Sequence, residues 1–281
     1  MSTSTQRVGR RARCASDGRW EDDPLWDRIR GELPLLWLWT TRQYRIRYRQ
    51  SALGWLWSVV QPTAMLAIYG FVLSALLKVG SAGLPYVSFA FAGLVPWTFA
   101  STAVSQAFPS TLGAGPLLTK TYFPREVIPL AVVGAACIDL GIATAVLCAI
   151  AIVQRVGISV TATSIVLIDV VLIMWVAAVS VVGAAIVVFV RDALHALPLF
   201  LQLVFFGTPI MYPITLLPLH WRWVEKVNPL GFAAEATRDA ILRHRWPEFP
   251  LLGAQAAVAA CALVAAIVYT RSVEPRIADI A

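Results

Sequence analysis

The chain has 281 residues, of which 58% are hydrophobic and only 14% are charged, with a formal net charge of +7. This balance excludes an ordinary soluble domain and indicates an integral membrane protein. The arginines are concentrated before the first apolar run, so a membrane surface explains them better than a nucleic acid does. The four cysteines form no CxxC pair and the three histidines are dispersed, so we expect neither a disulfide framework nor a metal site.

Six apolar runs are candidates for transmembrane helices, because a helix needs about 20 apolar residues to cross the hydrocarbon core. They cover residues 54–77, 86–107, 127–153, 158–190, 197–213 and 251–269. The sequence therefore predicts an all-α integral membrane protein with six transmembrane helices. Residues 35–270 would form the transmembrane domain, with an N-terminal tail of residues 1–34 and a C-terminal tail of residues 271–281.

Six spans place both termini on the same side of the membrane. If that side is the cytoplasm, it holds sixteen of the 23 Lys and Arg residues, as the positive-inside rule requires. The tail of residues 1–34 has mixed charge and no apolar periodicity, which is typical of a partly disordered segment.

An arginine-rich segment, RQYRIRYRQSALGWLWSVVQP, extends from Arg42 to Pro62 at the start of the first run. On a helix, Arg42, Arg45 and Arg49 fall on one stripe. The residues of the opposite stripe are all aromatic: Trp37, Tyr44, Tyr48 and Trp55. This pattern predicts an amphipathic helix in the membrane interface, and its simplest interpretation is a positive-inside anchor.

Two carboxylates, Asp139 and Asp169, fall inside the third and fourth runs. Intramembrane carboxylates are costly and often functional, so a proton relay must be considered. Capping by neighbouring helices, or a position close to the headgroups, is the simpler interpretation.

The string RYRQSALGWLWSVVQP, residues 47–62, resembles the opening signature of ABC type-2 exporter permeases of the polysaccharide class. That class moves lipid-linked O-antigen, teichoic acid or galactan across the plasma membrane. Four further strings are similar to this family in the family's order: KTYFPREVIPL (120–130), VRDALHALPLFLQ (190–202), TPIMYP (208–213) and VNPLGFAAEATRDAIL (227–242). The resemblance extends from about residue 35 to the C-terminus.

The resemblance implies that the arginine-rich segment is a gate helix at the cytoplasmic interface, beside the opening through which a lipid pyrophosphate-linked glycan enters. Guanidinium groups bind pyrophosphate through bidentate, charge-assisted hydrogen bonds, and flat aromatic rings stack on sugars. The candidate gate and substrate residues are Arg42, Tyr44, Arg45, Arg47, Tyr48, Arg49, Trp55 and Trp57. An interfacial aromatic belt remains the alternative for each ring.

The chain contains no GxxxxGK[ST] phosphate loop, so it cannot bind ATP in the usual way. The resemblance implies a homodimer of this chain with two copies of a separate ABC ATPase, which would bind ATP and Mg; the chain itself would be no enzyme and carry no cofactor. The turn between the second and third spans would dock on the ATPase by exposing two rings and fixed charges. Its candidate residues are Lys120, Tyr122, Phe123, Pro124, Arg125 and Glu126. A plain turn in which Pro124 starts the next helix is the alternative.

The connection of residues 214–250 is too long for a simple loop and too interrupted for a span. Asn228 followed by Pro229 is a helix-start signal. The resemblance implies short re-entrant helices here, before the last span, that gate the exit of the cargo. Glu235 and Arg238 lie one turn apart, so an ion pair is their simpler use, and contact with the leaving pyrophosphate is the alternative.

Export of a glycan linked to polyprenyl pyrophosphate across the bacterial plasma membrane is the function that the resemblance implies. A drug or a simple lipid is the alternative cargo. A proton-coupled secondary transporter is less well supported, because the sequence shows no inverted repeat. A membrane enzyme would need clustered carboxylates or histidines, and His195, His220 and His244 are far apart in the sequence.

Overall fold

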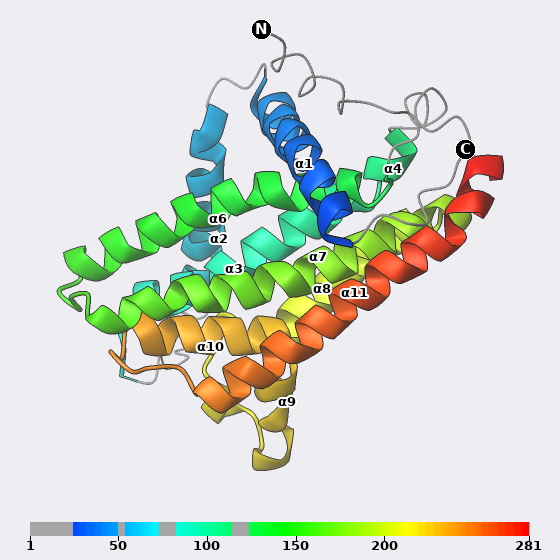
Figure 1. The fold of residues 1–281 in the computed structure, drawn as a ribbon. Coiled ribbons are helices and arrows are strands. Elements are labelled where there is room, and N and C mark those ends of the chain that lie inside the picture. The colour runs from blue at the N-terminus through cyan, green and yellow to red at the C-terminus, as the bar shows by residue number, and fades with distance from the viewer. Residues whose placement is uncertain (1–24, 50–53, 73–82, 114–123, 281) are drawn as a thin grey trace, which may run out of the picture.

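The computed structural model describes residues 25–49, 54–72, 83–113 and 124–280, and within these ranges the regular secondary structure is entirely helical. Side chains are described for these ranges except residues 25–33, 55, 69, 70 and 274–280. Helices α1 and α4 and the C-terminal end of α11 lie at one end of the molecule, and α9 lies at the opposite end (Figure 1). The two ends carry different parts of the candidate site.

The helices follow one another along the chain with few short 3₁₀ turns between them. Their bounds are α1 (Leu25–Tyr48), α2 (Trp57–Gly70), α3 (Tyr86–Ala107), α4 (Ser110–Gly113), α6 (Val127–Val153), α7 (Ile165–Phe189), α8 (Ala193–Gly207), α9 (Trp223–Val227), α10 (Pro229–Ile241) and α11 (Phe249–Ile280). Short 3₁₀ helices precede α2 (Gly54–Leu56) and α7 (Val160–Ser164), and two more (Ile214–Leu216, Leu219–Trp221) lie between α8 and α9.

Four helical segments of the described chain are long and apolar enough to cross a membrane. They are Tyr86–Ala107, Val127–Val153, Val160–Phe189 and Phe249–Val273, in the second, third, fourth and sixth predicted runs. The apolar helices in the first and fifth runs, Trp57–Ile68 and Ala193–Gly207, are shorter. The count of six spans therefore stays a prediction.

Several helix ends differ from the predicted limits. Helix α1 begins at Leu25, inside the predicted N-terminal tail, although this stretch lacks apolar periodicity and contains Gly31 and Pro34, which are poor helix formers. Helix α8 ends at Gly207, not at residue 213, since Thr208 adopts the extended conformation that a following proline favours. Helix α11 continues through the predicted C-terminal tail to Ile280.

Helix α3 is the centre of the bundle. It packs against α2, α6, α7, α8 and α10, and most of its side chains are buried, with Phe89, Phe91 and Leu94 completely enclosed. Helices α7 and α11 lie along each other at the periphery (Figure 1). Both expose large aliphatic residues such as Val166 and Val264, which suits a surface against lipid.

Gly93 allows α3 to approach the chain that follows α8. A Cβ atom at this position would overlap the Ile210 carbonyl and lie 2.7 Å from a guanidinium nitrogen of Arg238. The contact is with backbone, so it cannot be relieved by rotating a side chain.

Gly93→Ala is expected to destabilise the protein by about 1–3 kcal/mol, the usual cost of overpacking a filled core. Gly141→Ala in α6 is the control, because a Cβ there has open space among the described residues. The control is expected to gain about 0.5–1 kcal/mol from lower backbone entropy in the unfolded chain. Unfolding of the purified variants in mixed micelles measures both, and equal effects would contradict the close approach at Gly93.

Candidate functional site

Helix α1 has two faces with different chemistry. Arg42, Arg45 and Arg49 are all exposed, and together with apolar side chains such as Leu38 and Ile46 they line one shallow surface, called here the arginine face. The guanidinium of Arg42 also lies 4.7 Å from the ring centre of Trp39. The arginine stripe predicted from the sequence is therefore present and accessible.

The opposite face of α1 packs on α6 and carries an ion pair. Arg47 binds the Asp139 carboxylate, and the Tyr48 hydroxyl donates a hydrogen bond of 2.6 Å to the same carboxylate. A second nitrogen of Arg47 donates to the side-chain oxygen of Gln106 on α3. The side chains of Arg47 and Asp139 are only 14% and 16% exposed. Burial and the bond to Asp139 raise the pKa of the Tyr48 hydroxyl above its ordinary value.

The ion pair changes the interpretation of two sequence candidates. Asp139 is capped by a neighbouring helix, as the simpler interpretation proposed, and is not a free carboxylate. Arg47 is committed to Asp139, so it differs from the three exposed arginines in what it can offer to an anion. Residues 47 and 139 are 92 positions apart, and neither position shows in the sequence that it pairs with the other.

A cavity of about 220 Å³ lies beside this ion pair, between α1, α2, α3 and α6. Its polar and aromatic lining residues are Arg47, Tyr48, Trp57, Ser58, Gln61, Thr98, Phe99, Thr102, Gln106 and Asp139. We call this space the interfacial cavity. The cavity residues of α3 were not among the candidates from the sequence, because Thr and Gln in this helix look like ordinary polar positions within an apolar span.

The predicted aromatic candidates have different positions. Tyr48 and Trp57 line the interfacial cavity, and Tyr44 packs edge-to-face on Tyr48 with ring centres 5.0 Å apart. Helix α1 ends at Tyr48, so the prediction that Trp55 continues its aromatic stripe is wrong. Trp55 lies in a separate 3₁₀ turn, and its side chain is outside the described residues.

The turn before α6 differs from the docking turn that was predicted. Arg125 and Glu126 are only 8% and 2% exposed, so they do not present their charges to a partner. The Glu126 carboxylate instead accepts a hydrogen bond of 2.6 Å from Arg271 of α11. Pro124 lies in the turn before α6, with the Val127 amide donating to its carbonyl oxygen. Helix α6 begins at Val127, so the alternative in which Pro124 starts the helix is wrong as well. Lys120, Tyr122 and Phe123 lie outside the described residues.

At the other end of the molecule, the predicted helix start at residues 228–229 is confirmed. The Asn228 side chain accepts a hydrogen bond of 3.0 Å from the Leu230 amide, and Pro229 occupies the first turn of α10. The amide group of Asn228 also donates to the Thr208 hydroxyl at 2.7 Å. This contact joins the start of α10 to the end of α8.

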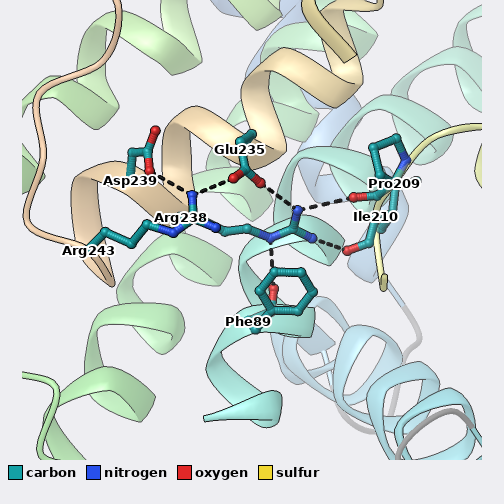
Figure 2. A network of polar contacts seen from close by, with 7 residues as sticks. All are labelled: Phe89, Pro209, Ile210, Glu235, Arg238, Asp239 and Arg243. Atoms are coloured by element: carbon teal, nitrogen blue, oxygen red, sulfur yellow. Dashed lines mark hydrogen bonds and ion pairs between the residues drawn. The ribbon is translucent and has the colours of Figure 1, made fainter. Parts of the chain in front are cut away.

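Arg238 of α10 is buried, with 1% of its surface exposed. It donates to the backbone carbonyls of Phe89 (3.2 Å), Pro209 (3.1 Å) and Ile210, and its guanidinium lies 3.9 Å from the ring centre of Phe89 (Figure 2). One of its nitrogens also binds Glu235 at 3.0 Å. The guanidinium is therefore surrounded by acceptors from three separate segments.

The predicted Glu235–Arg238 ion pair is confirmed. Arg243 extends the network by binding both Glu235 and, at 2.7 Å, Asp239 (Figure 2). Because Arg238 is enclosed and its donors are used by protein groups, it cannot touch a leaving pyrophosphate in this structure. Its role is to attach α10 to α3 and to the segment after α8.

Comparison with known proteins agrees with this architecture. Residues 34–242 match the ABC-2 type transporter family. The chain belongs to the ABC-2 type transporter family. An O-antigen export system permease protein RfbA of Klebsiella pneumoniae is 30% identical over 210 residues, which are 74% of this chain and 80% of that protein. The RfbA protein of Myxococcus xanthus is 28% identical over 230 residues, 80% of this chain and 86% of its own length. This ABC-2 chain is therefore a multi-pass membrane protein of the transporter permease type.

Arg238→Met is expected to lower the free energy of unfolding by about 3–5 kcal/mol, because it leaves buried carbonyls without a donor and breaks a buried ion pair. Lys226→Met is the matched control, since Lys226 pairs with Glu248 through side chains that are 60% and 67% exposed. An exposed pair contributes about 0–1 kcal/mol. Denaturant titration of both variants in micelles gives the comparison, and a similar small loss in both would remove the structural role of Arg238.

Proposed function

We propose that this chain is the permease subunit of an ATP-driven ABC exporter that moves a polysaccharide linked to polyprenyl pyrophosphate across the bacterial plasma membrane. Similarity to O-antigen export permeases over three quarters of the chain supports a polysaccharide cargo. The observation that carries the proposal is the arrangement around α1, which has exposed arginines on one face and a polar, aromatic-edged cavity on the other.

The arginine face is the proposed contact for the pyrophosphate. Arg42, Arg45 and Arg49 are exposed and share one surface with apolar side chains, which suits an anionic headgroup attached to a lipid. Each guanidinium offers a planar pair of donors that matches phosphate oxygens. The ion-paired Arg47 is assigned to holding α1 on the bundle and not to the headgroup.

The energy source is proposed to be a separate ABC ATPase, because the chain has no phosphate loop. Two copies of the ATPase would bind ATP and Mg and would work with a homodimer of this chain, with the translocation path along the two-fold interface. The burial of Arg125 and Glu126 leaves Lys120, Tyr122, Phe123 and Pro124 as the proposed docking residues.

Both termini are proposed to be cytoplasmic. In support, α1, α4 and the C-terminal end of α11 lie at the same end of the molecule (Figure 1), where the arginine face and the docking turn would both be needed. Helices α9 and α10 would then belong to the outer, exit side as re-entrant helices. The Arg238 network would set the position of α10 there, and Asn228 and Pro229 its start.

The double variant Tyr122→Ala/Phe123→Ala is expected to lose most ATP-dependent export while the complex still hydrolyses ATP, because the docking rings are gone. Phe200→Ala/Phe206→Ala is the control, since those exposed rings lie on α8, outside the docking turn and the exit helices. Export and phosphate release are measured together in proteoliposomes. Unchanged export in the first variant would remove the docking assignment.

The triple variant Arg42→Lys/Arg45→Lys/Arg49→Lys tests the cargo. If the arginines only anchor α1, each contributes about 1 kcal/mol of nonspecific attraction to anionic lipid. Lysine would provide the same attraction, so the triple variant would then behave like the wild type. Arginines that bind pyrophosphate need the planar geometry, so the variant is expected to lose most cargo-stimulated ATP hydrolysis. The reconstituted complex is titrated with a lipid pyrophosphate glycan while phosphate release is followed.

Arg191→Lys is the control for this titration, because Arg191 is also exposed but does not lie on α1. An unaltered half-maximal concentration and maximal rate in the triple variant would return the arginine face to an anchoring role. If no lipid-linked glycan stimulates ATP hydrolysis by the wild-type complex, the proposed function itself is overturned.

A further inference from the structure

We propose that the interfacial cavity binds a neutral sugar ring, and that the pyrophosphate of the same cargo does not occupy it. The identity of the cargo rests on the proposed function, but the assignment of the cavity rests on its own lining. Anionic and neutral parts of the cargo would thus be recognised on opposite faces of α1.

The charges in the cavity argue against an anion. Arg47 and Asp139 are its charged lining residues, and they are bound to each other. A pyrophosphate entering the cavity would have to displace Asp139 from Arg47 and would then face an unpaired carboxylate. Two like charges held close together in a partly buried site repel each other strongly, because little water lies between them to screen the repulsion. A neutral ligand does not meet this cost.

The hydrogen-bonding groups of the cavity match hydroxyl groups. Within the described chain, Gln61 and Thr102 make no hydrogen bond through their side chains, although both line the cavity. Gln106 uses its oxygen for Arg47, and its amide group has no acceptor among the described residues. Side-chain amides and hydroxyls both donate and accept hydrogen bonds, as sugar hydroxyls do. Each of these groups can therefore act as donor or as acceptor toward a sugar hydroxyl.

The volume of the cavity and the apolar part of its lining also suit one sugar ring. Trp57 is 49% exposed and supplies a flat apolar face, while Phe99 and Leu140 supply further apolar contacts. The volume of about 220 Å³ is below the roughly 300–1,000 Å³ of pockets that enclose drug-sized ligands. The cavity therefore has room for about one sugar ring, and the rest of a glycan would lie outside it.

The test uses the full chain in lipid nanodiscs and ligand-observed saturation-transfer NMR with the methyl glycosides of galactose, mannose and glucose. At least one glycoside is expected to receive saturation from the wild-type protein. Gln61→Leu/Thr102→Val keeps the side-chain volumes nearly unchanged, and it is expected to reduce that signal at least fivefold. Thr63→Val is the matched control, because Thr63 is on α2 but does not line the cavity.

Inorganic pyrophosphate distinguishes the two parts of the cargo. It is expected to leave the glycoside signal of the wild type unchanged, and to compete in Asp139→Asn, where Arg47 becomes an uncompensated positive charge. Absence of signal from all three glycosides, an unchanged signal in the double variant, competition in the wild type, or no competition in Asp139→Asn would each overturn the inference. The experiment needs neither the ATPase nor transport, so glycoside binding in a complex that exports nothing would reject the proposed function alone.

Discussion

The end of the molecule that carries α10 depends on one buried guanidinium. Helix α8 stops before Pro209, and the break leaves the carbonyls of Pro209 and Ile210 without partners from their own helix. Such groups are costly in an apolar environment, where no water replaces the missing donor. Arg238 donates to both carbonyls and to that of Phe89, so α10, α3 and the end of α8 are joined at one point. Glu235 balances the charge, and Gly93 provides the space.

Paired charges also hold the helices together at the end of the molecule that carries α1. Arg47 and Asp139 neutralise each other between α1 and α6, while the arginines of the opposite face remain exposed. The chain therefore separates charges that hold helices together from charges that are available to a ligand. This separation is the physical basis for assigning the arginine face to an anionic headgroup and the interfacial cavity to a neutral ring. It also explains why a proton relay through Asp139 is unnecessary to account for a carboxylate in a span.

The elements were predictable where the local sequence decides them. The ranges expected for the second and third spans, 86–107 and 127–153, coincide with α3 and α6, because proline and charged residues bound these long apolar runs. Asn228 and Pro229 likewise specify the start of α10 through a side-chain cap and a fixed φ angle. The prediction was wrong for the exposure of Arg125 and Glu126, because the partner of Glu126 is Arg271, 145 residues further along the chain.

By itself, the sequence determined that this is a helical membrane protein, where its main apolar helices lie and which arginines form a stripe, since these follow from composition and helical periodicity. It also carried the family resemblance, through short strings in order. Only the tertiary structure decided which arginines of α1 are exposed and which are held in an ion pair. Arg42 and Arg47 lie on the same helix and look equivalent in the sequence, but one faces outward and the other meets Asp139. That difference depends on how α1 packs on α6, and such packing arises from contacts between residues that are distant in the chain.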